Sequence, residues 1–393
     1  MKTNQVLSVL LLFLSTGFPA NADTSSMPLL PAGQYHTFET GFNIDNSWTL
    51  KKAIEKYQQQ ATEAGMKVKP LELDWSEIEP KEGKYNLEET IEKFETYSEK
   101  GWRPFVYLRA IDSDDITVPK YLKGTDDTIS LSDIDVSSPR FIARYNKLMD
   151  IIVPLVRKHN GFAIMIANEP DNFLTPNPEL TDQVITFLNA ARNHIHVIDS
   201  KMAVGVALSN GFDHDDDANN IREPLPHHLA LIKASDIAVY NFYCLKLPQE
   251  EQAGSIKARI QSRIAAAKGK DIVIQELGCP SGQKAGFSEE FQKRFFELAY
   301  NEMQDTSIRI SIVFQLVDWT EATIKFYGDA LRPVMDAEPA FKENPELIFL
   351  YLDQLGSIGL VSAKDGTPKP SWFEFLKAVK RNNNQTKKQI PTP

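Results

Sequence analysis

Two glutamates in this sequence each stand at the end of an apolar, strand-like run. Glu169 lies in the run IANEP at positions 166–170, and Glu276 lies in the run IQELG at positions 274–278. A strand that leaves a hydrophobic core carries its last side chains to the rim of that core, so the two carboxyl groups could meet at one bond. Paired carboxylates can hydrolyse a glycosidic bond, because one protonates the leaving oxygen while the other attacks or stabilises the sugar cation.

Eight segments rich in Val, Ile, Phe and Tyr could position such a pair, and each is followed by an amphipathic helical pattern. The expected strands are Tyr35–Gly41, Lys67–Leu73, Arg103–Arg109, Phe162–Asn168, Met202–Ala207, Asp236–Phe242, Asp271–Glu276 and Ile308–Leu316. The expected helices are Thr49–Ala64, Leu87–Lys100, Ser138–His159, Thr181–Ser200, Pro224–Ala234, Glu251–Lys268, Ser288–Met303 and Ser371–Arg381. Several strands are apolar on successive residues, which is typical of strands buried on both faces. Eight strand–helix units predict a (β/α)8 TIM barrel that forms a single catalytic domain over residues 23–381.

The N-terminus has the pattern of an export signal. Lys2 supplies a positive charge, residues 6–18 are mostly apolar, and residues 20–22 have the small-x-small pattern of a cleavage site. We therefore expect a signal peptide over residues 1–22 and a protein that is periplasmic or secreted. The apolar run is too short to cross a bilayer, and we expect no membrane span in the rest of the sequence.

Two other segments fall outside the strand–helix repeat. The connection Asp318–Pro370, between the eighth strand and the last helix, is much longer than the usual loop of a few residues. We expect this insertion to fold as a cover over one mouth of the barrel. The tail 382–393 is polar and contains proline, so we expect it to be disordered.

Charge and motif content bear on the partners. The net charge of −10 disfavours nucleic acid and anionic membranes. The sequence has neither a G-x-G-x-x-G nor a Walker motif, which disfavours a doubly wound nucleotide-binding sheet. His194 and His196 lie within one expected helix and have no ligand partner at metal spacing. We expect a monomer that needs neither cofactor nor metal.

In a (β/α)8 barrel the active site lies at the C-terminal ends of the strands. The side chains expected there are Arg109, Asn168, Glu169, Asn241, Tyr243, Glu276 and Trp319. The glutamates end the fourth and seventh strands. Together with the run WSEIEPKEGKYN at 75–86 and the ending GLVSAKDGTPKPSW at 359–372, they resemble clan A of the glycoside hydrolases, a superfamily of retaining (β/α)8 enzymes. The resemblance extends over roughly residues 35–379.

The resemblance implies an exported retaining O-glycoside hydrolase that acts on an oligo- or polysaccharide by double displacement. Glu169 would be the acid/base and Glu276 the nucleophile, with the carboxyl groups about 5–5.5 Å apart. Asn168 would hydrogen-bond the sugar 2-hydroxyl, Tyr243 would orient Glu276, and Trp319 would be an apolar platform under the sugar. The acid must keep its proton while the nucleophile is ionised, so we expect a raised pKa for Glu169.

Several of these residues also have a structural interpretation. Tyr243 and Trp319 could be core aromatics. Asn241 stands where many relatives carry histidine, and it could point into the site or cap a turn. Arg109 could bind substrate or pair with a structural carboxylate. The missing histidine and the uncommon sequence that begins at Arg109 also leave open a catalytically inactive carbohydrate-binding TIM barrel.

Two further features lie beside the expected strand ends. Cys244 and Cys279 follow the sixth and seventh strands, so they could form a disulfide or remain buried thiols. The acidic run Asp213–Asp217 follows the fifth strand. It could hold a cation through its carboxylates, or it could be a solvated acidic loop.

Overall fold

The computed structural model describes residues 30–389 except 42, 46, 114, 124–132, 214–221, 338–342 and 345. The strands form one sheet in the order β1-β9-β8-β7-β6-β5-β3-β2, and the short β4 pairs only with β3. Their bounds are β1 Tyr35–Phe38, β2 Val68–Glu72, β3 Arg103–Asp112, β4 Asp115–Ile116, β5 Ala163–Asn168, β6 Ala203–Leu208, β7 Ala238–Tyr243, β8 Ile272–Gly278 and β9 Ile308–Val313.

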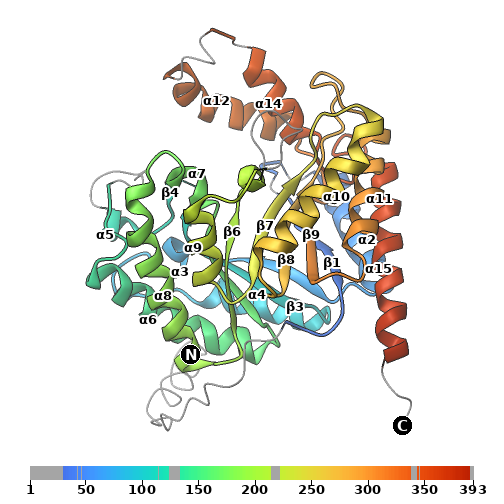
Figure 1. The fold of residues 1–393 in the computed structure, drawn as a ribbon. Coiled ribbons are helices and arrows are strands. Elements are labelled where there is room, and N and C mark those ends of the chain that lie inside the picture. The colour runs from blue at the N-terminus through green and yellow to red at the C-terminus, as the bar shows by residue number, and fades with distance from the viewer. Residues whose placement is uncertain are drawn as a thin grey trace.

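Eight of these strands are parallel and curl into a nearly closed barrel (Figure 1). The first strand along the chain, β1, pairs in parallel with the last, β9. At the other end of the sheet β2 lies beside β1. Each of the eight expected strands is present, and the predicted (β/α)8 TIM barrel is confirmed. Because β4 is a two-residue antiparallel strand, β5 is the fourth barrel strand and β8 is the seventh.

Helices surround the barrel and return the chain to the start of each next strand. Their bounds are α2 Trp48–Ala64, α3 Trp75–Ile78, α4 Glu88–Glu99, α5 Lys120–Lys123, α6 Pro139–Lys158, α7 Pro170–Leu174, α8 Thr181–Ile198, α9 Pro226–Ala234, α10 Gln249–Ala266, α11 Glu289–Met303, α12 Glu321–Ala337, α14 Glu346–Gly356 and α15 Pro370–Gln389, with the 3-10 turns η1 Pro178–Leu180 and η2 Asn210–Asp213. Ser47, Ser138 and Ser288 cap α2, α6 and α11, and each hydroxyl accepts a backbone N–H three residues later. No helix in the described part of the chain has the length and apolar character needed to cross a membrane.

The strands are buried on both faces, as their continuous apolar sequences predict. One set of strand side chains packs outward against the helices, and a second set fills the barrel interior. Gly205 on β6 belongs to the crowded interior: a Cβ there would lie 2.6 Å from Met165 Sδ and 2.9 Å from Val239 Cγ2. The packed interior leaves the polar side chains at the strand ends as the accessible part of the barrel.

The last helix, α15, packs against α2, α11 and β1, so it covers the barrel on the side of β1. It continues to Gln389, so the prediction that the chain is disordered from residue 382 is wrong for residues 382–389. The physical reason lies in two side chains of the extension. Asn382 Nδ2 bonds to the buried His36 Nε2 at 2.8 Å, and Asn383 Nδ2 donates to the carbonyl of Ala64 at 3.4 Å. Residues 390–393 lie outside the described part.

The long connection after β9 contains α12 and α14. Both helices stand above the barrel at the end where α7 begins, which is the end to which the strands deliver their C-terminal residues (Figure 1). The chain then returns through two isolated bridges, Val317 with Val361 and Val361 with Pro368. The insertion therefore lies on the same end of the barrel as the two glutamates.

Candidate active site

One asparagine links the two glutamates. Asn241 on β7 is the register partner of Glu276 on β8. Its side-chain Nδ2 donates to Glu169 Oε1 at 2.7 Å. Asn241 therefore touches one carboxyl group while its backbone lies beside the other residue. The structure brings both glutamates to one site, and Asn241 points into that site instead of capping a turn.

Glu169 is held in an unusual backbone conformation. It precedes the first residue of α7 and has a φ of 46° and a ψ of 35°, in the left-handed region. Its amide N–H donates to the carbonyl of Ala207 on β6 at 2.8 Å, which locks this turn to the neighbouring strand. Asn172 Nδ2, one turn into α7, donates to Glu169 Oε2 at 3.0 Å. Together with Asn241, it gives each carboxyl oxygen an amide donor.

The environment of Glu169 favours the protonated form. Its pKa is raised to about 7, chiefly by burial, and the nearby charges of Asp171 and Asp112 act in the same direction. The amide donors from Asn241 and Asn172 act in the opposite direction. A carboxyl group with this pKa can hold a proton near neutral pH and still release it, as an acid/base residue must.

Glu276 has different neighbours. The Tyr243 hydroxyl donates to Glu276 Oε2 at 2.5 Å. Burial raises the pKa of Glu276 and the charges of Glu169 and Glu39 raise it further, while Tyr243 and Arg109 lower it. The two glutamates thus raise each other's pKa, and ionising one favours the proton on the other. The phenol donor and the guanidinium favour the charge on Glu276, but burial and the neighbouring carboxylates outweigh them, and the net shift of its pKa is upward.

Asn168 is fixed by its own hydrogen bonds. Its Oδ1 accepts from Gln275 Nε2 at 2.8 Å, and its Nδ2 donates to Asp112 Oδ1 at 2.9 Å. Because the amide oxygen has a donor and the amide nitrogen has an acceptor, these contacts fix the orientation of the Asn168 side chain. Neither Gln275 nor Asp112 was among the residues expected in the site. Gln275 directly precedes Glu276 in the quoted run, so the run itself contained this signal.

Arg109 forms ion pairs at the rim of the site. Its guanidinium pairs with Glu72 at the end of β2 and lies 3.6 Å from Asp112 Oδ2. It also lies over the ring of Tyr107, 5.4 Å from the centroid. The structural pairing considered for Arg109 is therefore present. Its charge nevertheless acts on Glu276, so it also belongs to the electrostatics of the site.

A third carboxyl group, which the sequence reasoning missed, belongs to the same cluster. Glu39 follows β1, where its amide N–H donates to the carbonyl of Val313 at 3.0 Å. Burial raises the pKa of Glu39 to about 7, and Arg109 opposes the shift. The buried Lys69 beside it has a pKa lowered to about 7, also by burial. The signal was the same as for Glu169, a glutamate after an apolar strand, but the expected strand extended past Glu39.

Trp319 has one face occupied. Its ring stacks on Tyr327 of α12, with the centroids 4.5 Å apart and the planes at 11°. Only 9% of Trp319 is exposed. A platform under a sugar would have to use the other face, and the proposed role of Trp319 stays a prediction. Phe314, just past β9, is the aromatic that lies edge-on to Tyr243, at 6.3 Å between centroids.

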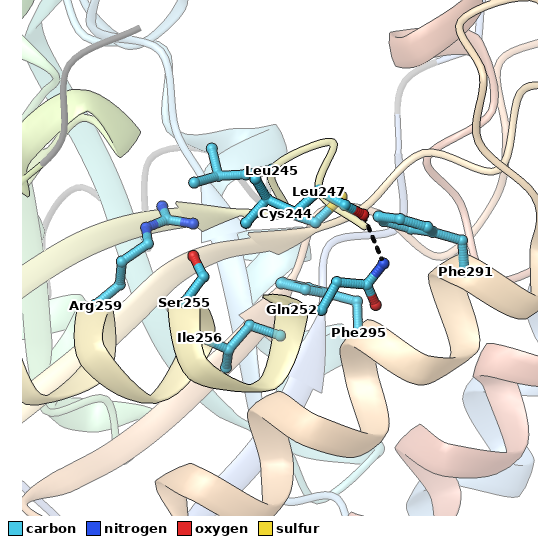
Figure 2. Close-up of a pocket in the computed structure, with 9 residues that line it drawn as sticks. All are labelled: Cys244, Leu245, Leu247, Gln252, Ser255, Ile256, Arg259, Phe291 and Phe295. Carbon is cyan, nitrogen blue, oxygen red and sulfur yellow. Dashed lines mark hydrogen bonds between the residues drawn. The ribbon is translucent and has the colours of Figure 1, made fainter. Parts of the chain in front are cut away.

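Cys244 and Cys279 form a disulfide, which decides between the two alternatives. It joins the loops that directly follow β7 and β8, next to Tyr243 and close to Glu276. Figure 2 shows a small cavity beside this disulfide, between α10 and α11. Gln252 Nε2 donates to the carbonyl of Leu247 there, at 3.2 Å. None of the candidate catalytic residues lines this cavity.

Two other sequence features have no place in the site. Glu79 is fully buried, accepts from Trp75 Nε1 at 2.9 Å and pairs with Arg144, so it is a structural carboxylate. The acidic run begins at Asp213, the end of η2, and its remaining residues 214–217 lie outside the described part. Among the described residues, no group of three or more His, Cys, Asp or Glu side chains is arranged to hold a metal ion.

No protein-family model matches this chain, and no curated protein matches its sequence. Solved structures do match. The exo-beta-1,4-mannosidase Op5Man5 from Opitutaceae bacterium strain TAV5 has a TM-score of 0.61 at 14% identity over 94% of this chain, and this chain spans only 63% of that protein.

Two further structures are similar over most of both chains. A GH5_18 protein from Bifidobacterium longum subsp. longum has a TM-score of 0.61 at 13% identity, covering 92% of this chain and 81% of its own. The beta-glycosidase BGL167 has a TM-score of 0.56 at 14% identity, covering 86% of this chain and 88% of its own. These neighbours are glycoside hydrolases, in agreement with the clan A resemblance, and at such low identity the likeness concerns the fold.

Proposed function

We propose that this protein is a retaining O-glycoside hydrolase with Glu169 as acid/base and Glu276 as nucleophile. The observation that carries the proposal is the link through Asn241, which bonds Glu169 and is the strand partner of Glu276. The two carboxyl groups share one site but have unlike neighbours. Both have acidic neighbours, but Glu169 has neutral amide donors, whereas Glu276 has a phenol donor and a nearby guanidinium.

The chemistry follows in two steps. Glu276 attacks the anomeric carbon while Glu169 gives its proton to the leaving oxygen, and a glycosyl ester forms on Glu276 as the glycosidic bond breaks. Esterification removes the negative charge of Glu276, so the pKa of Glu169 falls and it can take a proton from water. That water attacks the anomeric carbon, releases the sugar with its original configuration and regenerates the Glu276 carboxylate. This mechanism requires carboxyl groups about 5–5.5 Å apart.

The remaining polar residues would bind and orient. Asn168, held by Gln275 and Asp112, would donate its free N–H to the sugar 2-hydroxyl. A fixed donor needs no reorganisation when charge develops in the transition state, so it stabilises that state more than the substrate. Tyr243 would keep Glu276 aimed at the anomeric carbon. Trp319 would contribute only through its uncovered face.

The substrate class is a neutral oligo- or polysaccharide. The Bifidobacterium protein has a second structure described as a complex with Manb1-4GlcNAc, and another neighbour is called an exo-beta-1,4-mannosidase. We therefore propose β-mannosides as the first substrates to assay on this chain. Aryl β-mannosides, β-1,4-mannosyl disaccharides and a panel of other aryl glycosides and polysaccharides would cover the range.

We further propose that the protein is exported. Residues 1–22 have the signal-peptide pattern, and the Cys244–Cys279 disulfide is the kind of bond that persists in oxidising compartments. The mature protein from its native host should begin near Asp23. N-terminal sequencing that finds Met1 on the mature chain would contradict export by this signal.

Labelling and product stereochemistry test the mechanism. A 2-deoxy-2-fluoro aryl glycoside of the active sugar should esterify Glu276, and peptide mass spectrometry should locate the label there. Glu276→Gln and Glu169→Gln should each abolish turnover of an unactivated substrate, whereas Glu77→Gln, an exposed carboxylate on α3, should match the wild type. Full activity of Glu276→Gln, or NMR detection of the inverted anomer as first product, would refute the proposal.

The catalytically inactive carbohydrate-binding barrel is the second candidate. The specific observation in its favour is that burial raises the pKa of Glu276 as well as that of Glu169, and a neutral Glu276 could not attack. The same experiments separate the two functions. Such a protein would bind glycans in calorimetry, and it would neither turn over the aryl glycosides nor take up the fluorinated label.

A further inference from the structure

Asp171 lies two residues after Glu169, and its carboxyl group is buried between α7 and the end of β6. It belongs to the first turn of α7 and is only 1% exposed. The backbone amide of Ser209 donates to Asp171 Oδ1 at 3.0 Å and to Oδ2 at 3.1 Å, and Ser209 Oγ donates to Oδ2 at 2.7 Å. Because Ser209 directly follows β6, the carboxylate of Asp171 ties the start of α7 to the end of that strand.

This side-chain bond acts together with the backbone bond of Glu169. The amide of Glu169 donates to the carbonyl of Ala207, two residues before Ser209. The turn that carries Glu169 is therefore bonded to β6 at both of its ends. A left-handed residue with a φ of 46° persists only where the surrounding contacts hold it. The direction in which the Glu169 side chain leaves the backbone thus depends on the contacts of Asp171.

Helix α9 covers the other side of Asp171. His228 on α9 is 1% exposed, and its Nε2 lies 3.5 Å from Asp171 Oδ2. His228 Nδ1 accepts from the backbone amide of Leu225 at 3.2 Å, so this nitrogen carries no proton. The ring is then neutral, with its proton on Nε2, which faces the carboxylate. A neutral ring at this contact leaves the negative charge of Asp171 in place.

The other titratable groups around Asp171 are Glu169, Arg222 and His227. The ring of His227 lies 4.4 Å from that of His228, and burial and the charge of Arg222 lower its pKa. Burial raises the pKa of Asp171, while the Ser209 bonds and the charge of Arg222 lower it. Every Ser209 contact uses the carboxyl oxygens of Asp171 as acceptors, which suits the ionised form.

We infer that Asp171 is a positioning residue for the acid/base Glu169: it clamps the left-handed turn to β6 and places a buried negative charge beside the proton that Glu169 donates. The clamp keeps the Glu169 carboxyl group aimed at the leaving oxygen. The charge opposes ionisation of Glu169, in agreement with its raised pKa. The inference deepens the proposed function and rests on it.

Substrates that differ in their need for an acid test this inference. Asp171→Asn removes the charge and keeps the shape, because an amide oxygen can still accept from Ser209. The basic limb of kcat/KM for an unactivated glycoside should move to lower pH by about 0.5–1 pH unit, which at pH 7 is a loss of about two- to fivefold. A dinitrophenyl glycoside, whose leaving group needs no proton, should stay within about twofold of the wild type.

Asp182→Asn is the matched control. It also removes a carboxylate from the first turn of a helix, α8, but this carboxylate is exposed. It should leave the basic limb and the rates on both glycosides unchanged. A purely structural role of Asp171 would lower the rates on both glycosides and leave the basic limb of Asp171→Asn in place, and that result would overturn the inference.

Ser209→Ala decides the question if urea titration shows that Asp171→Asn does not fold. It keeps the charge of Asp171 and the backbone bond, and it removes only the hydroxyl bond of the clamp. The variant should slow the unactivated glycoside about twofold more than the dinitrophenyl glycoside. Equal effects on the two glycosides would overturn the inference.

Failure of this inference and failure of the proposed function give different results. If Asp171→Asn keeps the wild-type basic limb and rates while Glu169→Gln is inactive on the unactivated glycoside, Asp171 does not position the acid and the glycosidase stands. If Glu169→Gln is fully active on the unactivated glycoside, the proposed function itself is wrong.

Discussion

Replacing Tyr243 by phenylalanine removes one hydroxyl and leaves the ring in place. That hydroxyl donates to Glu276 Oε2 at 2.5 Å, and the ring lies edge-on to Phe314. The change therefore isolates the hydrogen bond from the packing. If Glu276 is an ionised nucleophile, its charge is partly stabilised by this donor, and the variant should lose that part.

The expected loss of kcat/KM follows from the kind of hydrogen bond that is removed. A hydrogen bond to a charged group contributes about 1.5–3 kcal/mol, which corresponds to about a 10- to 150-fold loss of kcat/KM. The pH profile should change as well. The Tyr243 bond lowers the pKa of Glu276, so its loss raises that pKa. Because the nucleophile works only when ionised, the acidic limb of kcat/KM should move to higher pH.

The assay is kcat/KM against pH with an aryl glycoside, together with the rate of labelling by the 2-fluoro analogue. Tyr240→Phe is the matched control, because Tyr240 lies on the same strand and donates to the carbonyl of Arg263 at 3.2 Å. Tyr240→Phe should lower the free energy of unfolding without changing the pH profile of kcat/KM. A Tyr243→Phe enzyme within twofold of the wild type and with an unmoved acidic limb would refute a role for this bond in activating Glu276.

Three further predictions follow from other contacts. Asn241→Ala removes a donor that lowers the pKa of Glu169, so the basic limb of kcat/KM, expected near pH 7, should move to higher pH in the same assay. An unmoved basic limb would exclude Glu169 as the acid. Arg144→Met leaves the carboxylate of Glu79 buried without its partner and should lower the unfolding free energy by about 3–5 kcal/mol in urea titration. An unchanged unfolding free energy would show that the Arg144–Glu79 pair is not a buried structural pair. Replacing both cysteines by serine should lower it by about 3–4 kcal/mol, because the disulfide closes a loop with a sequence separation of 35; an unchanged midpoint would contradict this.

The barrel was predictable because the sequence of each strand indicates whether its two faces are buried. A run such as Ala203–Leu208 is apolar on successive residues only if both faces are buried, and eight strand runs separated by helices have few alternative arrangements. The order of the strands then placed Glu169 and Glu276 at the same end of the barrel. Asn241 and Tyr243 followed from the same reasoning applied to the sixth strand.

The features that were missed depend on contacts between distant parts of the chain. Glu39 lies within a run that looks like a continuing strand, and only the end of β1 at Phe38 places it in the site. The helical extension of α15 is held by His36, some 346 residues away in sequence. The contact of Trp319 with Tyr327 depends on how the long connection Asp318–Pro370 packs, for which the local sequence has no signature.

The left-handed backbone at Glu169 lowers the stability of the fold while it carries a carboxyl group into the site. A residue with a Cβ in this region is less stable by about 1–2 kcal/mol than in ordinary helical geometry, and only glycine or asparagine adopts it readily. Selection for thermal stability alone would therefore drive position 169 toward glycine, which has no carboxyl group. The glutamate found there indicates that this turn is kept under strain for the sake of its side chain, and an inactive Glu169→Gly protein could melt at a higher temperature than the functional one.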